Sequence, residues 1–415
     1  MNYATTRVRL STNLLGSDIN VYGMARSFYE EYGIVSTIIA SRHLLPTKYT
    51  KILTVEQVPG FSKDPVFIEH MRKVAERNKQ TGKKYLLIAC GDGYAELVSK
   101  HKEELSKDFI CPYVDFDLFE KLSDKESFYN VCETYNLPYP GTFIITKEMA
   151  NKKESIQPPF EYPVALKPAN SIEYLNVDFE GRKKAFRIKS QEEFDDIVQK
   201  IYNAGYSADM IAQDFIPGDD SNMRVLNAYV DQNHKVRMMC LGHPLLEDPT
   251  PDAIGNYVAI LADYNQEIYQ TIQRFLEEIN YTGFANFDMK YDPRDGKYKL
   301  FEINLRQGRS SFFVTLSGYN LAKYVTEDRV FQKPFTETVY GNGNMLWLGV
   351  PKKIFFKYVK PSEDKTKAEK LLTEKKYGTT IFYKKDFSIK RYLVMYYTFY
   401  KYIDRFKKYF KENKG

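Results

Sequence analysis

The chain has 415 residues, enough for two or three domains, and its content of 43% hydrophobic and 27% charged residues is ordinary for a globular protein. The net charge of +6 is uneven, because residues 351–415 carry 19 Lys or Arg against 7 Asp or Glu, so that residues 1–350 sum to −6. Basic charge confined to one end, with no recognised nucleic-acid-binding motif, argues against a nucleic-acid partner.

The cysteines and the apolar runs bear on where the protein acts. The four cysteines are scattered without a CxxC pair, which is typical of reduced thiols in a cytoplasmic protein and gives no support for a zinc site. The N-terminus lacks the apolar segment of a secretory signal, and no run approaches the roughly 18 apolar residues of a membrane span. We therefore expect a cytoplasmic protein.

Residues 1–118 alternate predicted strands and helices, the pattern of an open α/β sheet. We expect strands at 7–15, 34–40 and 85–90 and helices at 19–32 and 94–101. The turns Gly16-Ser17-Asp18 and Gly91-Asp92-Gly93 lie between a strand and a helix, where free backbone N–H groups bind ligands in open sheets. A purely structural turn is the alternative for each. Neither turn is GxGxxG, so a nicotinamide cofactor is unsupported.

Two lysines stand out between residues 119 and 168. Ser123 and Glu126 match a capping box that would open a helix to about Tyr135, with Lys125 in its first turn. Lys167 lies near the end of the apolar strand 162–168, where a buried ammonium group without a partner is costly. An anionic ligand would satisfy either lysine; a solvated Lys125 and a structural Lys167 are the alternatives.

Residues 210–218 form another apolar run, which contains Gln213, Phe215 and Ile216 and stops at Pro217-Gly218. Asp219 and Asp220 follow directly. A plain strand and turn is the alternative to a binding role. Further on, the spacing of apolar residues over 266–279 predicts a helix that faces a core.

A hairpin is predicted at residues 283–305, with Asp288 on its first strand and Glu302 and Asn304 on its second. Residues i and i+2 of a strand point to the same face, so Glu302 and Asn304 stand side by side. Two carboxylates and an amide oxygen suit Mg²⁺. An ordinary solvated hairpin is the alternative. Donors for phosphate or carboxylate follow at once: Arg306, Arg309, Ser310 and Ser311.

The segments FDMKY and LFEINLRQGRSS resemble the metal-and-phosphate hairpin of the ATP-grasp superfamily, and the chain is similar nearly end to end to its members that build peptidoglycan cross-bridges. The resemblance implies an α/β fold with an open pre-ATP-grasp domain at 1–118 and an ATP-grasp domain at 119–335. Within the latter it implies a mobile lid at about 140–212 and a metal and phosphate base at 213–335. A basic, aromatic C-terminal extension would cover 336–415.

The resemblance also implies a role for each candidate residue. In the lid we expect a hairpin at 170–185, where Arg182, Lys183 or Lys184 would replace by charge the glycine-rich loop of many relatives. Arg306 would be the catalytic donor to the tetrahedral oxyanion. The other roles are Mg²⁺ binding by Asp288, Glu302 and Asn304; ATP phosphate binding by Lys125 and Lys167; adenine contacts by Gln213, Phe215 and Ile216; ribose binding by Asp220, with Asp219 as its competitor; and binding of the acid substrate by Gly16, Ser17, Asp18, Gly91, Arg309, Ser310 and Ser311.

The implied reaction is ATP-dependent amide formation. ATP, with one or two Mg²⁺ ions or Mn²⁺ as a substitute, would phosphorylate the β-carboxylate of D-aspartate. The ε-amine of a lysine in a muramoyl-peptide precursor would then capture the acylphosphate. The alternatives are another ATP-grasp amino-acid or peptide ligase, a carbamoyl-phosphate-synthetase-like enzyme, and a nucleotide-binding scaffold without activity. The intact set of Asp, Glu and Asn argues against the scaffold.

The C-terminus predicts one further element. Residues 389–410 place Leu393, Tyr396, Tyr400, Ile403 and Phe406 at helical spacing, with Lys and Arg between them. Such a helix could dock on an anionic membrane surface, which would bring the protein to the inner face of the membrane. Packing against the body of the protein is the alternative.

Overall fold

The computed structural model describes residues 10–152, 154–174 and 176–414. Its N-terminal sheet is parallel, in the order β3-β2-β1-β4. Its strands are β1 (Leu10–Leu15), β2 (Ser36–Ala40), β3 (Leu53–Gln57) and β4 (Lys84–Ala89). Around it lie α1 (Ile19–Tyr32), α2 (Val66–Lys79), α3 (Asp92–Lys100), α4 (Lys102–Leu105) and the 3₁₀ helix η1 (Leu45–Thr47). The predicted open α/β sheet is confirmed, except that residues 7–9 of the first predicted strand lie outside the described residues.

Two helices lead from this sheet to the next, α5 (Phe116–Ser123) and α6 (Lys125–Thr134). The predicted capping box is wrong. Ser123 ends α5, and the side chain of Asp124 caps α6 by accepting from the backbone N–H of Ser127 at 2.9 Å. An aspartate at this position offers a charged acceptor to the helix N-terminus, which explains why it serves as the cap.

The second sheet is antiparallel, in the order β5-β8-β6-β7, and has a core of its own. The elements are β5 (Thr142–Ile145), α7 (Lys147–Asn151), β6 (Val164–Pro168), α8 (Ser171–Tyr174), β7 (Phe186–Ile188), α9 (Gln191–Asn203) and β8 (Met210–Asp214). The hairpin predicted at 170–185 is wrong for the described residues, which form α8 and turns. Asn170 caps α8, and the ring of Tyr174 is buried against Tyr206, so a cap and a packed ring hold this segment as a helical turn.

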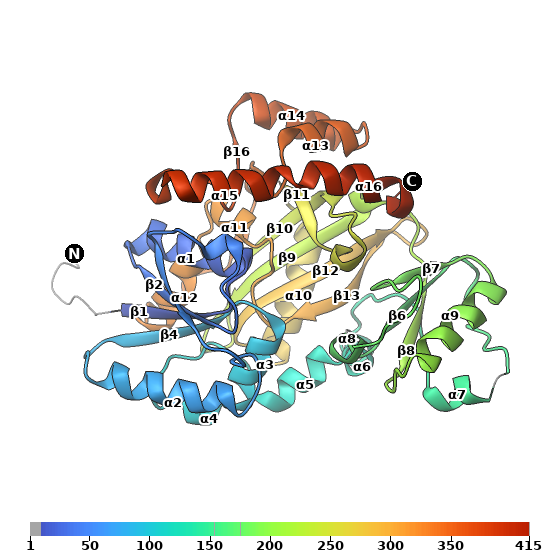
Figure 1. The fold of residues 1–415 in the computed structure, drawn as a ribbon, viewed down its shortest axis with the longest axis horizontal. Helices are drawn as coiled ribbons and strands as arrows, with labels where there is room; N and C mark the ends of the chain where they lie inside the picture. Colours follow the sequence, from blue (N-terminus) through green and yellow to red (C-terminus); the bar gives the residue numbers. More distant parts are fainter. Residues whose placement is uncertain (1–9, 153, 175, 415) are drawn as a thin grey trace.

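The third sheet is the largest and lies at the centre of the molecule (Figure 1). Its order is β13-β12-β9-β10-β11-β15-β16, and β14 also pairs with β10. Its strands are β9 (Met223–Val230), β10 (Val236–Glu247), β11 (Tyr257–Asp263), β12 (Gly283–Asp292), β13 (Lys297–Asn304), β14 (Val339–Gly341), β15 (Leu346–Leu348) and β16 (Tyr377–Gly378). The connections include η2 (Asp220–Asn222), η3 (Pro251–Ala253), α10 (Gln266–Glu278), α11 (Phe312–Leu316) and α12 (Leu321–Arg329).

Both faces of this central sheet are buried, because successive residues of a strand point to opposite sides. Leu226 and Ala228 of β9 pack in one core with Phe275 of α10, which confirms the predicted core-facing helix. Val225 and Tyr229 pack in a second core with Phe28 of α1. The central sheet therefore holds the N-terminal part rigidly against its own face.

The C-terminal segment crosses back to the N-terminal sheet through α13 (Lys352–Tyr358), α14 (Glu363–Thr373), η4 (Lys384–Asp386), α15 (Ile389–Tyr400) and α16 (Tyr402–Lys414). The single helix predicted at 389–410 is broken at Lys401. Asp386 is fully buried, accepts from Tyr22 at 2.8 Å and Thr50 at 2.7 Å, and forms an ion pair with Arg391 at 2.9 Å. A buried charge that loses its partner costs about 3–5 kcal/mol, so this network fixes α15 on the N-terminal part.

None of the described helices is long and apolar enough to cross a membrane. We propose that the boundaries at residues 118 and 335 separate domains, although β14, β15 and β16 come from beyond residue 335 and extend the central sheet.

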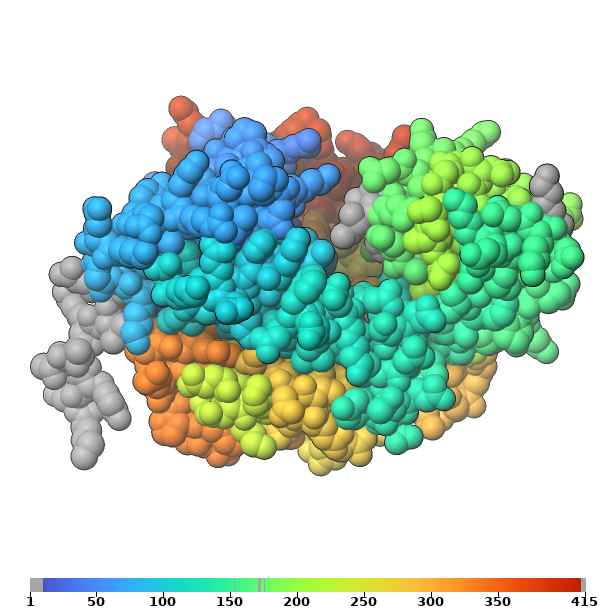
Figure 2. All heavy atoms as spheres, turned by 90° about the horizontal axis from the view of Figure 1, so that it is seen from below, coloured from blue at the N-terminus to red at the C-terminus, as the bar shows by residue number. Residues whose placement is uncertain are grey.

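The three sheets leave a hollow between the N-terminal part, in blue, and the second sheet, in green (Figure 2).

Candidate active site

The hairpin β12–β13 contains a β-bulge at its polar end. Met289 pairs with Leu300 and Asp288 with Glu302, so Phe301 is left without a partner across the ladder. The bulge lets Leu300 and Ile303, three residues apart, face the same core. It also sets Glu302 and Asn304 opposite Asp288 and Asn286, on the face away from that core. In the sequence, the adjacent apolar residues Leu300 and Phe301 interrupt the alternation and indicate this bulge.

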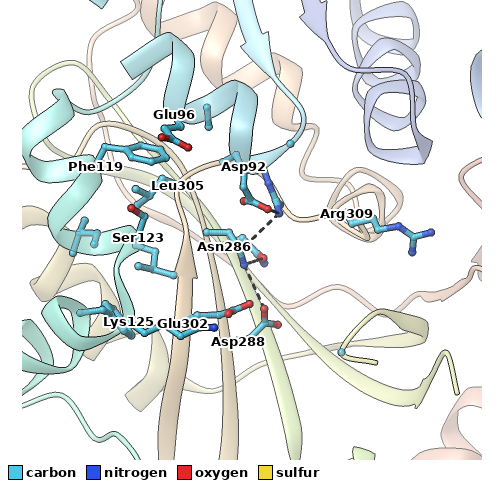
Figure 3. A pocket seen from close by; sticks show the side chains of 18 of the residues that line it. Asp92, Glu96, Phe119, Ser123, Lys125, Asn286, Asp288, Glu302, Leu305 and Arg309 are labelled. Atoms are coloured by element: carbon cyan, nitrogen blue, oxygen red, sulfur yellow. Dashed lines mark hydrogen bonds and ion pairs between the residues drawn. The ribbon is translucent and has the colours of Figure 1, made fainter. Parts of the chain in front are cut away.

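Two carboxylates meet at this point. Asp288 and Glu302 lie directly across the ladder (Figure 3). Tyr257 of β11 donates to Asp288 Oδ1 at 3.0 Å. Burial raises the pKa of Asp288 to about 7, and the neighbouring charge of Glu302 adds to the rise. Nδ2 of Asn304 donates to Asn286 Oδ1 at 3.1 Å and to Asp288 Oδ2 at 3.4 Å.

This donor set fits a hard dication. A cation between the two carboxylates would neutralise their repulsion, and carboxylate and amide oxygens are ligands that Mg²⁺ prefers. Within the described residues no cluster of three or more His, Cys, Asp or Glu side chains is arranged to hold a metal. The protein would thus supply only part of the coordination shell, and phosphate or water oxygens would complete it.

Arg306 reaches this site from the loop after β13. Its Nη2 donates to Asp92 Oδ2 at 2.8 Å and to Asn304 Oδ1 at 3.3 Å, and its Nη1 donates to the carbonyl of Gln307 at 2.9 Å. Asp92 is the first residue of α3, so the guanidinium bridges the N-terminal sheet and the hairpin. A guanidinium held on two sides is oriented before any ligand binds.

The two lysines lie on the other side of the carboxylates. Lys125 Nζ donates to the carbonyl of Pro168 at 3.1 Å, and Lys167 Nζ donates to the hydroxyl of Tyr129 at 3.1 Å. Burial lowers the pKa of Lys125 to about 8, helped by the charge of Lys167. Burial also lowers the pKa of Lys167 to about 8. Tyr129 in turn donates to the carbonyl of Phe301 at 2.9 Å, so the backbone of the bulge holds the hydroxyl to which Lys167 donates.

The predicted adenine segment begins with Gln213 inside β8 and continues into the loop after that strand. Gln213 is buried and donates to Thr142 Oγ1 at 2.8 Å, and Lys290 donates to the carbonyls of Ile216 and Gly218 at 2.8 and 2.9 Å. The ammonium of Lys290 also lies 5.2 Å from the centroid of the Phe215 ring. Lys290 thus fixes this segment from β12, a contact that the sequence analysis did not predict.

The two aspartates after this segment differ in their partners. Asp219 pairs with Lys360 at 2.9 Å and accepts from Ser221, and the pKa of Asp219 falls to about 2 because these hydrogen bonds outweigh the effect of burial. Asp220 accepts from the backbone N–H of Glu247 at 3.1 Å. Both aspartates thus have partners within the protein, and the ribose contact of Asp220 stays a prediction.

The turn after β1 supplies the third group of candidates. Gly16 has φ of +116° and a Cβ there would lie 3.0 Å from Val21, so the turn requires glycine. Ser17 bonds away from the cavity, to the loop at Arg42 and Leu44. The carboxylate of Asp18 caps α1. Burial raises the pKa of Asp18, opposed by the capping N–H groups and by the charges of Arg309 and Arg306.

One cavity of about 750 Å³ collects part of these residues. Figure 3 shows Lys125 beside Glu302, with Arg309 on the opposite side of the pocket. The predicted residues that line the cavity are Asp18, Gly91, Lys125, Asp288, Glu302, Asn304, Arg306, Arg309 and Ser310. Of the three basic candidates at 182–184, Lys184 lines it, whereas Arg182 donates to the carbonyl of Tyr174 and pairs with Asp252.

The other predicted residues are not on that lining: Gly16, Ser17, Lys167, Gln213, Phe215, Ile216, Asp220 and Ser311. Ser311 is buried at the start of α11, and the nucleotide candidates lie around β6 and β8. Tyr257 and Asn286 are among the lining residues that were not predicted, and Asp92 belongs to the predicted turn at 91–93, although no role was assigned to its side chain. The alternation of β12 could have identified Asn286, which shares a face with Asp288, but no sequence signal connects Tyr257 of β11 to this hairpin.

No family model matches the chain. It is 67% identical over 408 residues to a D-aspartate ligase of Enterococcus faecium strain Aus0004, with 97% of each chain covered. The chain belongs to the D-aspartate ligase family. This confirms the predicted relationship, and the protein is accordingly an amide-bond-forming ligase.

Solved structures show the fold of this D-aspartate ligase family member. It is similar to the L-amino acid ligase from Bacillus licheniformis, with a TM-score of 0.55 and 15% identity, covering 78% of this chain and 75% of the other. It is also similar to phosphoribosylamine–glycine ligase from Thermotoga maritima, with a TM-score of 0.55 and 14% identity, covering 81% and 78%. The predicted ATP-grasp fold is confirmed.

Proposed function

We propose that the protein joins the β-carboxylate of D-aspartate to the ε-amine of a lysine in a cytoplasmic muramoyl-peptide precursor, using ATP and Mg²⁺. The observation that carries the proposal is one cavity in which Asp288, Glu302 and Asn304 face the cations Lys125 and Arg306. Charge of both signs within one cavity suits a reaction that moves a phosphoryl group onto a carboxylate. The 67% identity to a protein named D-aspartate ligase supports the choice of acid.

Asp288, Glu302 and Asn304 would hold the cation. Mg²⁺ bound there would neutralise the negative charge on the phosphate oxygens. Lys125 and Lys167 would bind the phosphates from the side of the second sheet, and the segment from Gln213 to Ile216 would receive the adenine. The site thus binds the nucleotide at the junction of the second and third sheets.

The remaining charges of the cavity suit an amino acid. Arg309 would take the α-carboxylate of aspartate with the help of Ser310, and the carboxylate of Asp18 would accept from its ammonium group. Arg309 and Asp18 are close enough for the arginine to lower the pKa of Asp18. With these two groups bound, only one hand of aspartate directs its β-carboxylate to the phosphate. Arg306 would donate to the oxyanion when the amine attacks.

The reaction itself is the first test. The purified protein with ATP, Mg²⁺, D-aspartate and a lysine-containing muramoyl-peptide precursor is expected to release ADP and add one aspartyl residue to the lysine side chain. Mass spectrometry identifies the product, and hydroxylamine traps the acylphosphate when the precursor is omitted. D-Asparagine is the control, since its amide cannot be phosphorylated, and Mn²⁺ replaces Mg²⁺ in a parallel assay. If L-aspartate reacted equally well, or another acid reacted better, the specificity for D-aspartate would be contradicted. Only the general ligase activity would then be supported.

The lysines predict a pH dependence for nucleotide binding. Each ammonium must be protonated to bind phosphate, and the free site holds Lys125 and Lys167 with pKa values of about 8. ATP affinity is therefore expected to fall as the pH rises from about 7 to about 9, by up to about tenfold for each lysine, with proton uptake on binding. Calorimetry in buffers of different ionisation enthalpy measures that uptake. Lys167→Met should reduce it, and a binding enthalpy independent of the buffer at pH 8 would contradict the assignment.

A further inference from the structure

The solvent-facing side of α15 is apolar. Ile389 is 72% exposed, Leu393 61% and Tyr397 59%, whereas the charged Arg391 is buried with Met395. A helix on the surface of a protein in water normally has the opposite arrangement, with its apolar side chains inward and its charges outward. We call this exposed side, formed by the outward residues of Ile389–Tyr400, the α15 face.

Contacts on the buried side of α15 fix the rotation of this helix about its own axis. Arg391 pairs with Asp386 at 2.9 Å, donates to the carbonyls of Pro46 and Lys48 at 3.0 and 2.9 Å, and lies 4.1 Å from the ring centroid of Tyr22. The helix cannot roll to bury Leu393 without breaking this buried ion pair. Figure 1 shows α15 above α1, and Tyr22 of α1 contacts both residues of the pair, because its hydroxyl donates to Asp386 and its ring lies against Arg391. The apolar face is therefore a property of the folded protein.

The α15 face is also continuous and rich in aromatic rings. Phe387, Tyr392, Tyr396 and Tyr400 form a row along the helix, with centroid separations of 5.9, 6.0 and 4.1 Å between successive rings. All four are exposed. Contiguous apolar surface of this kind marks an interaction site, whereas single exposed apolar residues do not. Tyrosine in particular favours the boundary between water and lipid.

The charge along this segment is predominantly positive, and the next acidic residue, the exposed Asp404, lies on α16. Between Lys375 and Ile403 the sequence has seven basic residues and a single acidic one, Asp386, which is buried. Lys390 and Lys401 are exposed at the two ends of α15, and the ammonium of Lys401 lies 4.6 Å from the Tyr397 ring centroid. The exposed part of this segment thus offers aromatic and positive groups and no negative ones.

We propose that the α15 face docks on the surface of an anionic lipid bilayer, with its tyrosines at headgroup depth and its lysines on the lipid phosphates. The contact would be peripheral, since no described helix can span a membrane. A second copy of the chain fits less well, because a symmetric contact would set Lys390 and Lys401 against the same lysines with no exposed acid in the segment to pair with them. This inference is independent of the substrates proposed above.

Sedimentation with vesicles tests the proposal. The full chain is expected to bind vesicles of phosphatidylcholine with about a third phosphatidylglycerol at about 0.05 M salt, and to dissociate at about 0.5 M salt. Vesicles of phosphatidylcholine alone should bind at least about tenfold more weakly. The double variant Leu393→Glu, Tyr397→Glu should lose at least about tenfold in affinity for the anionic vesicles, since it places negative charge on the face.

The matched control is Phe335→Glu, which replaces an exposed apolar residue outside α15 and should bind like the unaltered chain. Circular dichroism should show both variants folded, and their ligase activity in solution should be unchanged. Absence of binding at low salt overturns the proposal, and so does binding that the double variant keeps. A dimer in light scattering that the double variant abolishes, without vesicle binding, would assign the face to a second copy instead.

Discussion

Replacement of Glu302 by glutamine is expected to lower turnover by about 10³-fold or more, because the cation site loses one of its two carboxylates and phosphoryl transfer depends on charge compensation. The expected loss is in kcat measured as ADP release, and it should not be restored by a tenfold increase in Mg²⁺. Asn304→Ala should shift the Mg²⁺ dependence in the same direction by a smaller factor, since it removes a neutral ligand.

The fold should survive this change. Glu302→Gln removes the repulsion between Asp288 and Glu302 but also the attraction of Glu302 to Lys125 and Lys167, so the two effects offset and Tm should change little. Asp295→Asn is the matched control, since it removes a carboxylate from the exposed turn of the same hairpin and should keep full activity. Near-normal turnover of Glu302→Gln at an ordinary Mg²⁺ concentration would contradict the assignment of Glu302 as a metal ligand.

The second large effect is expected at Arg306. Arg306→Ala should lower kcat by about 10²–10³-fold while the KM for ATP changes little, because a donor to a developing oxyanion acts mainly in the transition state. Arg306→Lys should recover only a small part of this loss, since the single nitrogen of an ammonium cannot replace both Nη2, which donates to Asp92 and Asn304, and Nη1, which donates to the carbonyl of Gln307.

Arg77→Ala is the control for Arg306, because Arg77 forms an exposed pair with Glu56 far along the chain from the hairpin. A rise in KM for aspartate with kcat unchanged would instead give Arg306 a role in binding the substrate. In that case the oxyanion contact would be assigned to another donor of the cavity.

The hairpin was predictable from the sequence because its signals are local. Asp288, Glu302 and Asn304 stand on two short alternating runs joined by a turn, so their proximity follows from the strand period and a turn of few residues. Lys125 and Lys167 required more than local pattern, since a lysine in an apolar run has several explanations. The structure brings Lys125 to the cavity and holds Lys167 behind it through Tyr129.

Contacts between distant segments were not predictable in the same way. Tyr257 reaches Asp288 only because β11 and β12 belong to one sheet, and Asp92 reaches Arg306 only because the N-terminal sheet packs on that sheet. In the C-terminal tail, helical spacing identified the apolar residues but not their direction. Leu393 and Tyr396 were assigned to one stripe with Phe406, yet they are exposed while Phe406 is buried, because the buried pair Arg391–Asp386 sets the rotation of α15.

The bulge at Phe301 has a consequence for how the hairpin can change in length. Loss of Phe301 would leave Leu300 opposite Met289 and Glu302 opposite Asp288, so the polar ligands would still face the cavity. The carbonyl bound by Tyr129 and the ring beside Lys167 would be lost. An insertion or deletion elsewhere inside β13 would exchange its two faces and turn Glu302 or Asn304 into the apolar core. Within β13, Phe301 is thus the position at which relatives can differ by one residue and keep the same ligands.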